Sequence, residues 1–202
     1  MSKIALIVTN GCSPDPRVER HARWLAEAGH DVTIYAWDRA HELDQKTIRN
    51  GYTIFRVRIG SRAASFPITV VRQKQKFLNA LKGQFDLVLY NDSDSIGTKN
   101  IHAARRMLDL HDIAHAWPVM QKTNFLRKLL SARMKKQLRK SVSSFDGFFT
   151  SSAGLSTYFE QHFSIKSTVV LNLRNSNSLP RPKTKKIGFF GRIRDYDAMV
   201  LL

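Results

Sequence analysis

Histidine and carboxylate side chains are densest in the stretch 109–118 of this sequence, DLHDIAHAWP. A histidine there could hydrogen-bond a sugar hydroxyl, and a tryptophan could pack against the face of a sugar ring. The candidates for such contacts are His111, Asp112, His115 and Trp117. The alternative is that both histidines are capping or surface residues of a loop, because loops hold such residues as well as functional ones.

Metal binding is the rival chemistry for this stretch. His111 and His115 would need a further ligand, and the sequence contains no HExxH pattern. Cys12 is the only cysteine, which excludes an internal disulfide and a cysteine-rich metal site. We therefore expect no metal, and the lone thiol favours a reducing, cytoplasmic location.

Two further loops follow expected strands. Asn10 and Gly11 end the apolar run 3–9, and Asp92 stands in a polar cluster just after the run 85–90. Because ligands of parallel sheets bind beyond the carboxyl ends of the strands, Asn10 and Asp92 are candidates for contacting an acceptor. Gly11 could let a ligand approach the backbone at a helix N-terminus, although a tight turn would explain a single glycine equally well.

Strands and helices must alternate to position these loops. Apolar, β-branched runs predict strands at 3–9, 31–37, 52–59, 85–90, 146–150 and 167–171. Apolar residues at helical spacing, with capping residues at the ends, predict helices at 16–28, 65–81, 96–108, 122–144 and 153–162. The first strand, helix and strand follow one another closely, as in a right-handed βαβ unit. The sequence therefore predicts an α/β fold with a Rossmann-like, doubly wound parallel sheet.

The length of 202 residues suits one well-buried α/β domain and a remainder. We expect a domain at 1–171, a linker at 172–186 that is rich in Ser, Asn, Pro and basic residues, and the start of a truncated second domain at 187–202. In that last segment Arg192 and Arg194 stand where a strand ends and a helix begins, which could clamp a diphosphate. A solvated basic turn is the alternative.

Lysine and arginine outnumber aspartate and glutamate by 33 to 16, for a net charge of +17. Polyanions such as nucleotide diphosphates, nucleic acid or anionic lipid headgroups are therefore the expected neighbours. The stretch 121–145 holds eight of the cations and no acid. A helical projection puts Leu126, Leu130, Met134, Leu138 and Val142 on one apolar arc, and it puts Lys128, Lys135, Lys136, Arg139 and Lys140 opposite.

That basic face could lie on an anionic membrane, which would make the protein peripheral on the inner membrane face. The alternative is an ordinary helix whose apolar arc packs on the core and whose basic face is solvated. The N-terminal apolar run is too short to span a bilayer and predicts a strand, not a signal peptide. We do not expect nucleic-acid binding, because no aromatic platform or helix-turn-helix pattern accompanies the charge.

Several blocks of the sequence resemble the GT-B fold glycosyltransferases, in the large retaining family that includes sucrose synthases and bacterial mannosyl- and glucosyltransferases. The blocks are PRVERHA at 16–22, LAEAGHDVT at 25–33, DLHD at 109–112 and IGFFGRIR at 187–194. The resemblance makes this chain the N-terminal, acceptor-side half of a GT-B fold with only the start of the donor domain. That family usually has a strand just before DLHD, and the expected helix 96–108 leaves no room for one, so we expect this interior strand to be missing.

The resemblance implies two Rossmann-like domains that face a cleft, with the acceptor on the first and a nucleotide-sugar mainly on the second. It implies that catalytic His111 contacts the sugar, that Gly11 lies near the transferred sugar and phosphates, and that Arg192 binds the donor diphosphate. It also implies retention of configuration without a metal cofactor. The acceptor would be a glycan or a lipid-linked intermediate of cell-surface polysaccharide biosynthesis.

Because the donor domain's paired glutamates are absent, the 202-residue chain by itself is expected to be inactive. The alternative function is a noncatalytic, basic Rossmann-like module that binds an anionic membrane or a protein partner.

Overall fold

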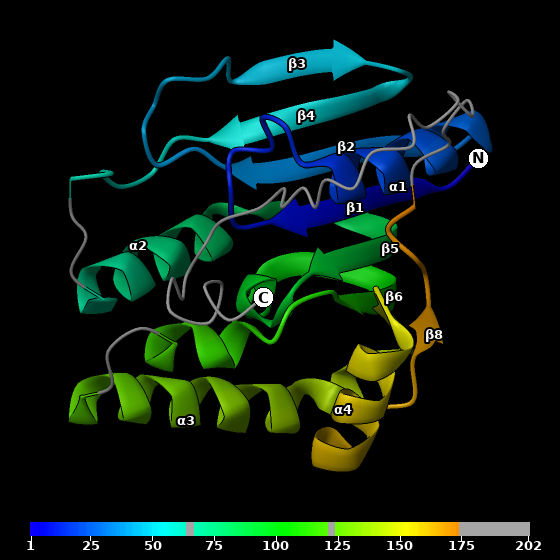
Figure 1. The fold of residues 1–202 in the computed structure, drawn as a ribbon. Coiled ribbons are helices and arrows are strands. Elements are labelled where there is room, and N and C mark those ends of the chain that lie inside the picture. Colours follow the sequence, from blue (N-terminus) through cyan, green and yellow to red (C-terminus); the bar gives the residue numbers. More distant parts are fainter. Residues whose placement is uncertain (64–66, 121–123, 174–202) are drawn as a thin grey trace, which may run out of the picture.

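An eight-stranded sheet runs through the part of the chain that the computed structural model describes, residues 1–63, 67–120 and 124–173 (Figure 1). The strand order is β3-β4-β2-β1-β5-β6-β7-β8. Neighbouring strands are parallel except for the edge pair β3 and β4. The predicted Rossmann-like, doubly wound parallel sheet is therefore confirmed.

The strands are β1 (Lys3–Val8), β2 (Asp31–Trp37), β3 (Lys46–Arg49), β4 (Tyr52–Val57), β5 (Lys82–Asn91), β6 (Asn100–Leu110), β7 (Gly147–Thr150) and β8 (Thr168–Val169). The helices are α1 (Pro16–Glu27), α2 (Pro67–Ala80), α3 (Phe125–Ser141) and α4 (Ala153–Phe163), and the short 3₁₀ helices are η1 (Ser93–Ser95), η2 (Ala114–Val119) and η3 (Val142–Ser144). Strand β3 was not predicted, because its sequence KTIR is largely exposed at the sheet edge and lacks a buried apolar pattern.

Strand β1 is apolar at every position after Lys3, because both of its faces are covered. Ile4, Leu6 and Val8 belong to the core on one face of the sheet, and Ala5 and Ile7 belong to the core on the other. Side chains of a strand alternate between the two faces, so a strand that is covered on both sides needs apolar residues throughout.

Helices cover both faces of the sheet. Val18 and Ala22 of α1 pack in one core cluster, and Phe77 of α2, Leu138 of α3 and Phe159 of α4 pack in the other. Figure 1 shows α1 on one side of the strands and the other three helices on the opposite side. The two cores therefore hold the carboxyl ends of the central strands in fixed positions.

The predicted helix 96–108 is wrong, because residues 100–110 form strand β6. β6 lies between β5 and β7 and pairs in parallel with both, so the sheet satisfies backbone groups that a helix would otherwise satisfy internally. The interior strand that we expected to be missing before His111 is thus present. The crossover from β5 is instead a short segment that passes α2, where Gln75 donates to the carbonyl oxygen of Gly97 at 3.3 Å.

Helix α3 is present as predicted, but its apolar arc is only partly buried. Leu138 is in the core, whereas Leu126 is exposed, so the apolar arc does not pack on the core along its whole length. The five predicted membrane-facing cations, Lys128, Lys135, Lys136, Arg139 and Lys140, are all exposed. Among the described helices, none has both the length and the apolar content needed to cross a bilayer.

Candidate functional site

The carboxyl ends of β1 and β5 meet where the strand order reverses. β1 leads through α1 to β2 on one side, and β5 pairs with its other side, so the topological switch point lies between β1 and β5. Doubly wound sheets bind ligands at such a point, because the loops on either side diverge. A hydrogen bond of 2.5 Å from Thr9 Oγ1 to Asp94 Oδ2 joins the two loops. The loop after β1, which contains Asn10, and the loop after β5, which contains Asp92, therefore lie at the same edge of the sheet.

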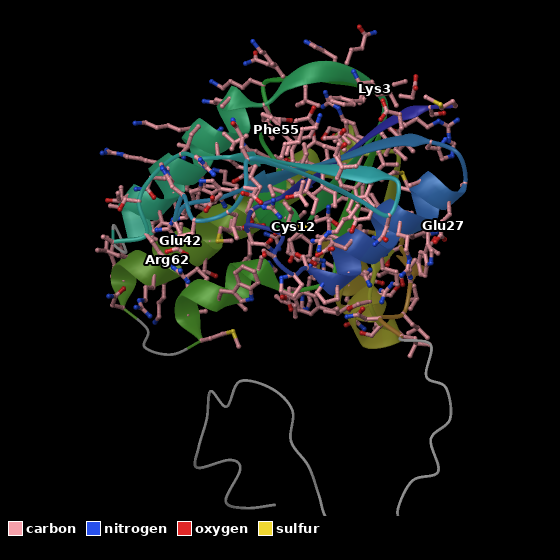
Figure 2. The ribbon with its side chains drawn as sticks, turned by 90° about the horizontal axis from the view of Figure 1, so that it is seen from above. Lys3, Cys12, Glu27, Glu42, Phe55 and Arg62 are labelled. Carbon is pink, nitrogen blue, oxygen red and sulfur yellow. The ribbon has the colours of Figure 1, made fainter. Side chains whose placement is uncertain are left out.

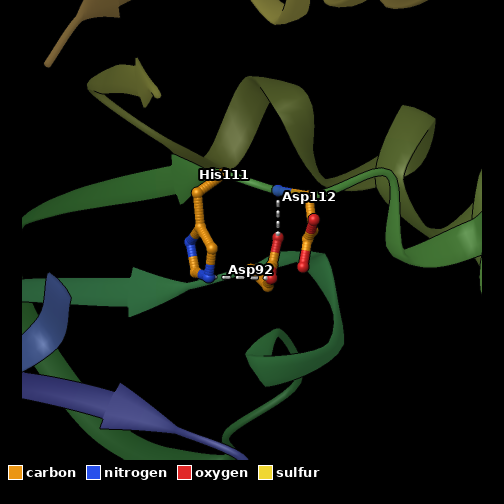
Figure 3. Close-up of side chains that lie close together, drawn as sticks. All are labelled: Asp92, His111 and Asp112. Atoms are coloured by element: carbon orange, nitrogen blue, oxygen red, sulfur yellow. Dashed lines mark hydrogen bonds and ion pairs between the residues drawn. The ribbon is translucent and has the colours of Figure 1, made fainter. Parts of the chain in front are cut away.

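Asp92, His111 and Asp112 gather at this edge (Figure 3). His111 Nε2 lies 3.2 Å from Asp92 Oδ2, and the backbone N–H of Asp112 donates to Asp92 Oδ1 at 3.3 Å. Asp92 is 5% exposed, His111 is partly exposed and Asp112 is exposed. The cluster thus extends from the core to solvent, and it brings Asp92 next to His111 and Asp112, which the sequence predicted in a different stretch.

The backbone around Asp92 holds its carboxyl in place. Asp92 has a φ of +66°, which is uncommon for a residue other than glycine. Its N–H donates to the carbonyl oxygen of Asp109 at 2.8 Å, and its own carbonyl accepts from the backbone N–H and the hydroxyl of Ser95. These hydrogen bonds fix the turn that points the carboxyl toward His111.

The Asp92 carboxyl is strongly perturbed. Burial, followed by the nearby negative charges of Asp94, Asp112 and Asp109, raises its pKa well above the usual range. A carboxyl in this environment can hold a proton at a pH at which an exposed aspartate would be ionised. In its protonated form Asp92 can donate a hydrogen bond within this cluster.

The same three side chains could hold a divalent cation. One ligand atom from each of Asp92, His111 and Asp112 lies within 4.8 Å of the others. Imidazole nitrogen and carboxylate oxygen are both common ligands of transition metals. The hydrogen bonds described above satisfy Asp92 without a cation, and our expectation of a metal-free site stays a prediction.

A buried ion pair adjoins the cluster. Arg17 Nε and Nη2 donate to Asp109 Oδ2 and Oδ1, each at 2.7 Å, and Arg17 Nη1 donates to the carbonyl oxygen of Val170 at 2.9 Å. Arg17 is 4% exposed and Asp109 is fully buried. The pair ties α1 to the end of β6 and to the segment after β8. Since His111 follows Asp109 by two positions, the pair helps to fix where His111 stands.

Sequence reasoning missed Arg17 as a site residue. Arg17 and His21 lie one helical turn apart, on the side of α1 that also buries Val18 and Ala22. Charged or titratable residues within the apolar stripe of a helix were the signal that could have revealed them. Burial lowers the pKa of His21 to about 4, and its Nδ1 lies 3.7 Å from Asp109 Oδ2.

Asn10 organises the loop after β1. Its Oδ1 accepts from the backbone N–H of Cys12 at 2.7 Å, and its Nδ2 donates to Asp15 Oδ2 at 2.8 Å. Asp15 in turn caps α1 by accepting from the N–H of Val18. Both ends of the Asn10 amide are therefore engaged within the loop, and its contact with an acceptor stays a prediction.

Gly11 stands in a tightly packed part of this loop. A Cβ at position 11 would come within 2.7 Å of Leu43 Cδ1. The Gly11 carbonyl accepts from Arg56 Nε at 2.7 Å, and buried Arg56 also donates to the carbonyl oxygen of Cys12 at 3.1 Å. Figure 2 shows Cys12 inside the molecule, where burial raises the pKa of its thiol to about 12. The loop is held from within, and an approach of phosphates to Gly11 stays a prediction.

His115 and Trp117 have different surroundings, although both lie in η2. His115 is 2% exposed, and its Nε2 shares a 2.8 Å hydrogen bond with the hydroxyl of Tyr158. Trp117 is 44% exposed. His115 is thus part of the core between η2 and α4, whereas Trp117 is available to a ligand.

Stability should fall in mild acid partly through His115. Burial, with help from Lys135, lowers the His115 pKa to about 4, below the usual value of 6.5. Between pH 6.5 and pH 4 the histidine takes up a proton in the unfolded state but not in the folded state. The contribution of neutral His115 to the free energy of unfolding is therefore complete above pH 6.5 and is lost as the pH falls toward 4. Between pH 7 and pH 5 the loss should be about 2 kcal/mol.

Urea unfolding of the wild type and of H115Q at both pH values measures this loss. H115Q should lack that part of the pH dependence, because glutamine does not titrate. H102Q replaces an exposed histidine of β6 and should behave as the wild type. An identical pH dependence in the wild type and in H115Q would contradict the assignment.

Two hollows lie elsewhere in the described part of the chain. One of about 780 Å³ runs beside α1 and is lined by Pro16, Glu19, Arg20, Arg23, Trp24, Asn50, Tyr52, Asn172 and Leu173. The other, of about 590 Å³, is lined by Lys3, Gln84, Phe85, Asp86, His102, Ala103 and Ala104. Neither includes the Asp92 cluster. Arg192 and Arg194, like most of the predicted linker and all of 187–202, lie outside the described residues.

The chain is similar to known proteins both in sequence and in fold. The family model of Glycosyltransferase Family 4 matches residues 17–173. No curated protein matches the chain.

Solved structures share the fold at low sequence identity. A sucrose-phosphate synthase from Thermosynechococcus elongatus matches with a TM-score of 0.57 and 13% identity, over 85% of this chain and 48% of that one. An Arabidopsis thaliana UGT complexed with UDP-L-rhamnose matches with a TM-score of 0.51 and 11% identity, over 92% of this chain and 55% of that one. The chain therefore spans about half the length of these two proteins.

Proposed function

The chain belongs to Glycosyltransferase Family 4, and from this premise we propose that it is the acceptor-side half of a retaining enzyme that transfers a sugar from a nucleotide-sugar to a glycan or lipid-linked acceptor. The observation that carries the proposal is the pairing of His111 with Asp92 at the switch point of the sheet, 3.2 Å apart. A paired histidine and carboxyl can bind a sugar hydroxyl and hold a proton there.

Each residue of the site has a role in this proposal. His111 contacts the transferred sugar, and Asp92 orients its imidazole through the bond to Nε2. Asp112 and Trp117 are exposed and meet the acceptor, the first by hydrogen bonds and the second by packing on a sugar face. Arg17 and Asp109 do not touch the substrate but keep the end of β6 in register.

The donor side of the proposal rests on a second domain. Gly11 would approach the phosphates from the first domain, and Arg192 and Arg194 would bind the diphosphate. The isolated chain would then be inactive. The whole enzyme would need no metal, and it would work at the inner face of the membrane. The activity should therefore survive a chelator, and the product should keep the anomeric configuration of the donor.

A noncatalytic module is the second candidate function, and the exposed basic face of α3 favours it. Such a module would bind an anionic membrane or a partner protein through that face without turning over a sugar.

Donor turnover tests the proposal. The whole gene product that contains this sequence is incubated with uridine, guanosine and adenosine diphosphate sugars and a glycan or lipid extract, and release of the nucleoside diphosphate is measured. We expect turnover of at least one donor by the whole product, and none by the 202-residue chain alone. A whole product that turns over none of the donors would favour the noncatalytic module.

A further inference from the structure

Exposed apolar side chains gather where η2 leads into α3. Phe125 and Leu129, in the first two turns of α3, are 78% and 56% exposed. Leu126 and Met120 are exposed as well. We call these four residues the apolar tip. The Ser131 hydroxyl donates to the carbonyl oxygen of His115 at 2.6 Å, which holds η2 against α3 and so keeps both parts of the tip on one structural unit.

The outward face of α3 continues from the apolar tip as a row of cations. Phe125, Leu129, Lys136 and Lys140 lie at spacings of four and seven residues, so they share one side of the helix. Arg133 and Arg139 are exposed beside them, and Arg139 also rests on the ring of Phe163. The helix sequence, FLRKLLSARMKKQLRKS, contains no acid. One surface therefore combines an apolar end with a long basic face.

The apolar tip lies at the same edge of the molecule as the candidate site. In Figure 1 the arrowheads of β1, β2 and β4 point to the side on which α3 begins. The first turn of α3 also carries the positive end of the helix dipole, which favours an anion beside it. A surface bound through the apolar tip would thus lie next to the end of the sheet that holds His111.

We propose that the apolar tip and the basic face of α3 bind an anionic membrane, with the tip inserted among the lipid headgroups and the cations over their phosphates. Aromatic and leucine side chains favour this interfacial depth, and lysine and arginine beside them add electrostatic attraction. A second copy of the chain is a poorer occupant, because it would bring two surfaces of the same sign together in a protein of net charge +17. The inference does not depend on sugar transfer.

Vesicle sedimentation of the 202-residue chain tests the proposal. Phosphatidylcholine vesicles are compared with phosphatidylcholine mixed with phosphatidylglycerol, and binding is expected only to the anionic mixture. F125S/L129S should weaken that binding by about 30-fold, because two large apolar side chains no longer leave water. K136Q/K140Q should weaken it by about 25-fold, because each cation near an anionic surface contributes about fivefold. Salt should weaken the wild type more than K136Q/K140Q.

I48S is the matched control, since Ile48 is 68% exposed on β3 at the far edge of the sheet. It should bind vesicles as the wild type does. All the substituted residues are on the surface, and equal thermal unfolding of the variants checks that they fold.

Equal binding to neutral vesicles, or unchanged binding by F125S/L129S, would overturn the proposal. Gel filtration covers the competing occupant. A wild-type dimer that F125S/L129S converts to a monomer, without vesicle binding by either, would make the tip a contact between copies and would also overturn it. Vesicle binding without any sugar transfer by the whole gene product would leave this inference standing while the proposed function fails.

Discussion

Replacing Asp109 with asparagine is expected to lower the free energy of unfolding by ~3–5 kcal/mol. Asp109 is fully buried and receives two hydrogen bonds from Arg17, which is 4% exposed. D109N keeps the shape of the side chain but leaves the guanidinium without a countercharge in a place that water does not reach. Urea unfolding followed by circular dichroism measures the loss.

Two further variants separate the ion pair from other effects. R17M/D109L removes both charges and should be less destabilised than the sum of R17M and D109L, because neither single charge is left stranded. E27Q breaks the exposed pair between Arg23 and Glu27, 3.7 Å apart on the surface of α1, and should cost no more than about 0.5 kcal/mol. If D109N costs as little as E27Q, the pair does not hold α1 to β6 in the way we infer.

Replacing His111 with alanine is expected to lower the turnover of the whole enzyme by about 10²-fold or more, since a positioned acid or base contributes about 10²–10⁴-fold. The expectation rests on the proposed transfer reaction and on the position of His111, 3.2 Å from Asp92 at the switch point. Initial rates of nucleoside diphosphate release, measured at saturating donor and acceptor, give the effect.

The controls for His111 come from the same strand and the same pair. H102A removes an exposed histidine near the start of β6 and should leave turnover unchanged. D92N keeps a hydrogen-bonding partner for His111 but removes the carboxyl that can hold a proton, so it should alter the pH profile of turnover as well as its size. Equal turnover in H111A and H102A would remove His111 from the proposed mechanism.

The sequence determined those parts of the protein whose causes are local. Asp15 and Pro16 predict where α1 begins, and Asp15 does cap it. The uniform apolar run of β1 predicts a strand covered on both faces, as observed. Periodicity and capping depend on residues a few positions apart, so they can be recognised without knowing the fold. The stretches that resemble the glycosyltransferase family could also be recognised from the sequence alone, and for this reason the fold class could be predicted.

Only the tertiary structure decided how the site is assembled. The segment 96–108 has apolar residues at spacings that fit a helix, but residues 100–108 belong to β6 because β5 and β7 lie on either side of that strand. Asp92 and His111 could each be chosen from the sequence, but their pairing depends on β6 lying next to β5. Arg17 and Asp109 are 92 positions apart, and no local pattern links them. Strand pairing and burial depend on residues that are distant in the sequence. These two effects bring the residues of the candidate site together, which the sequence alone could not show.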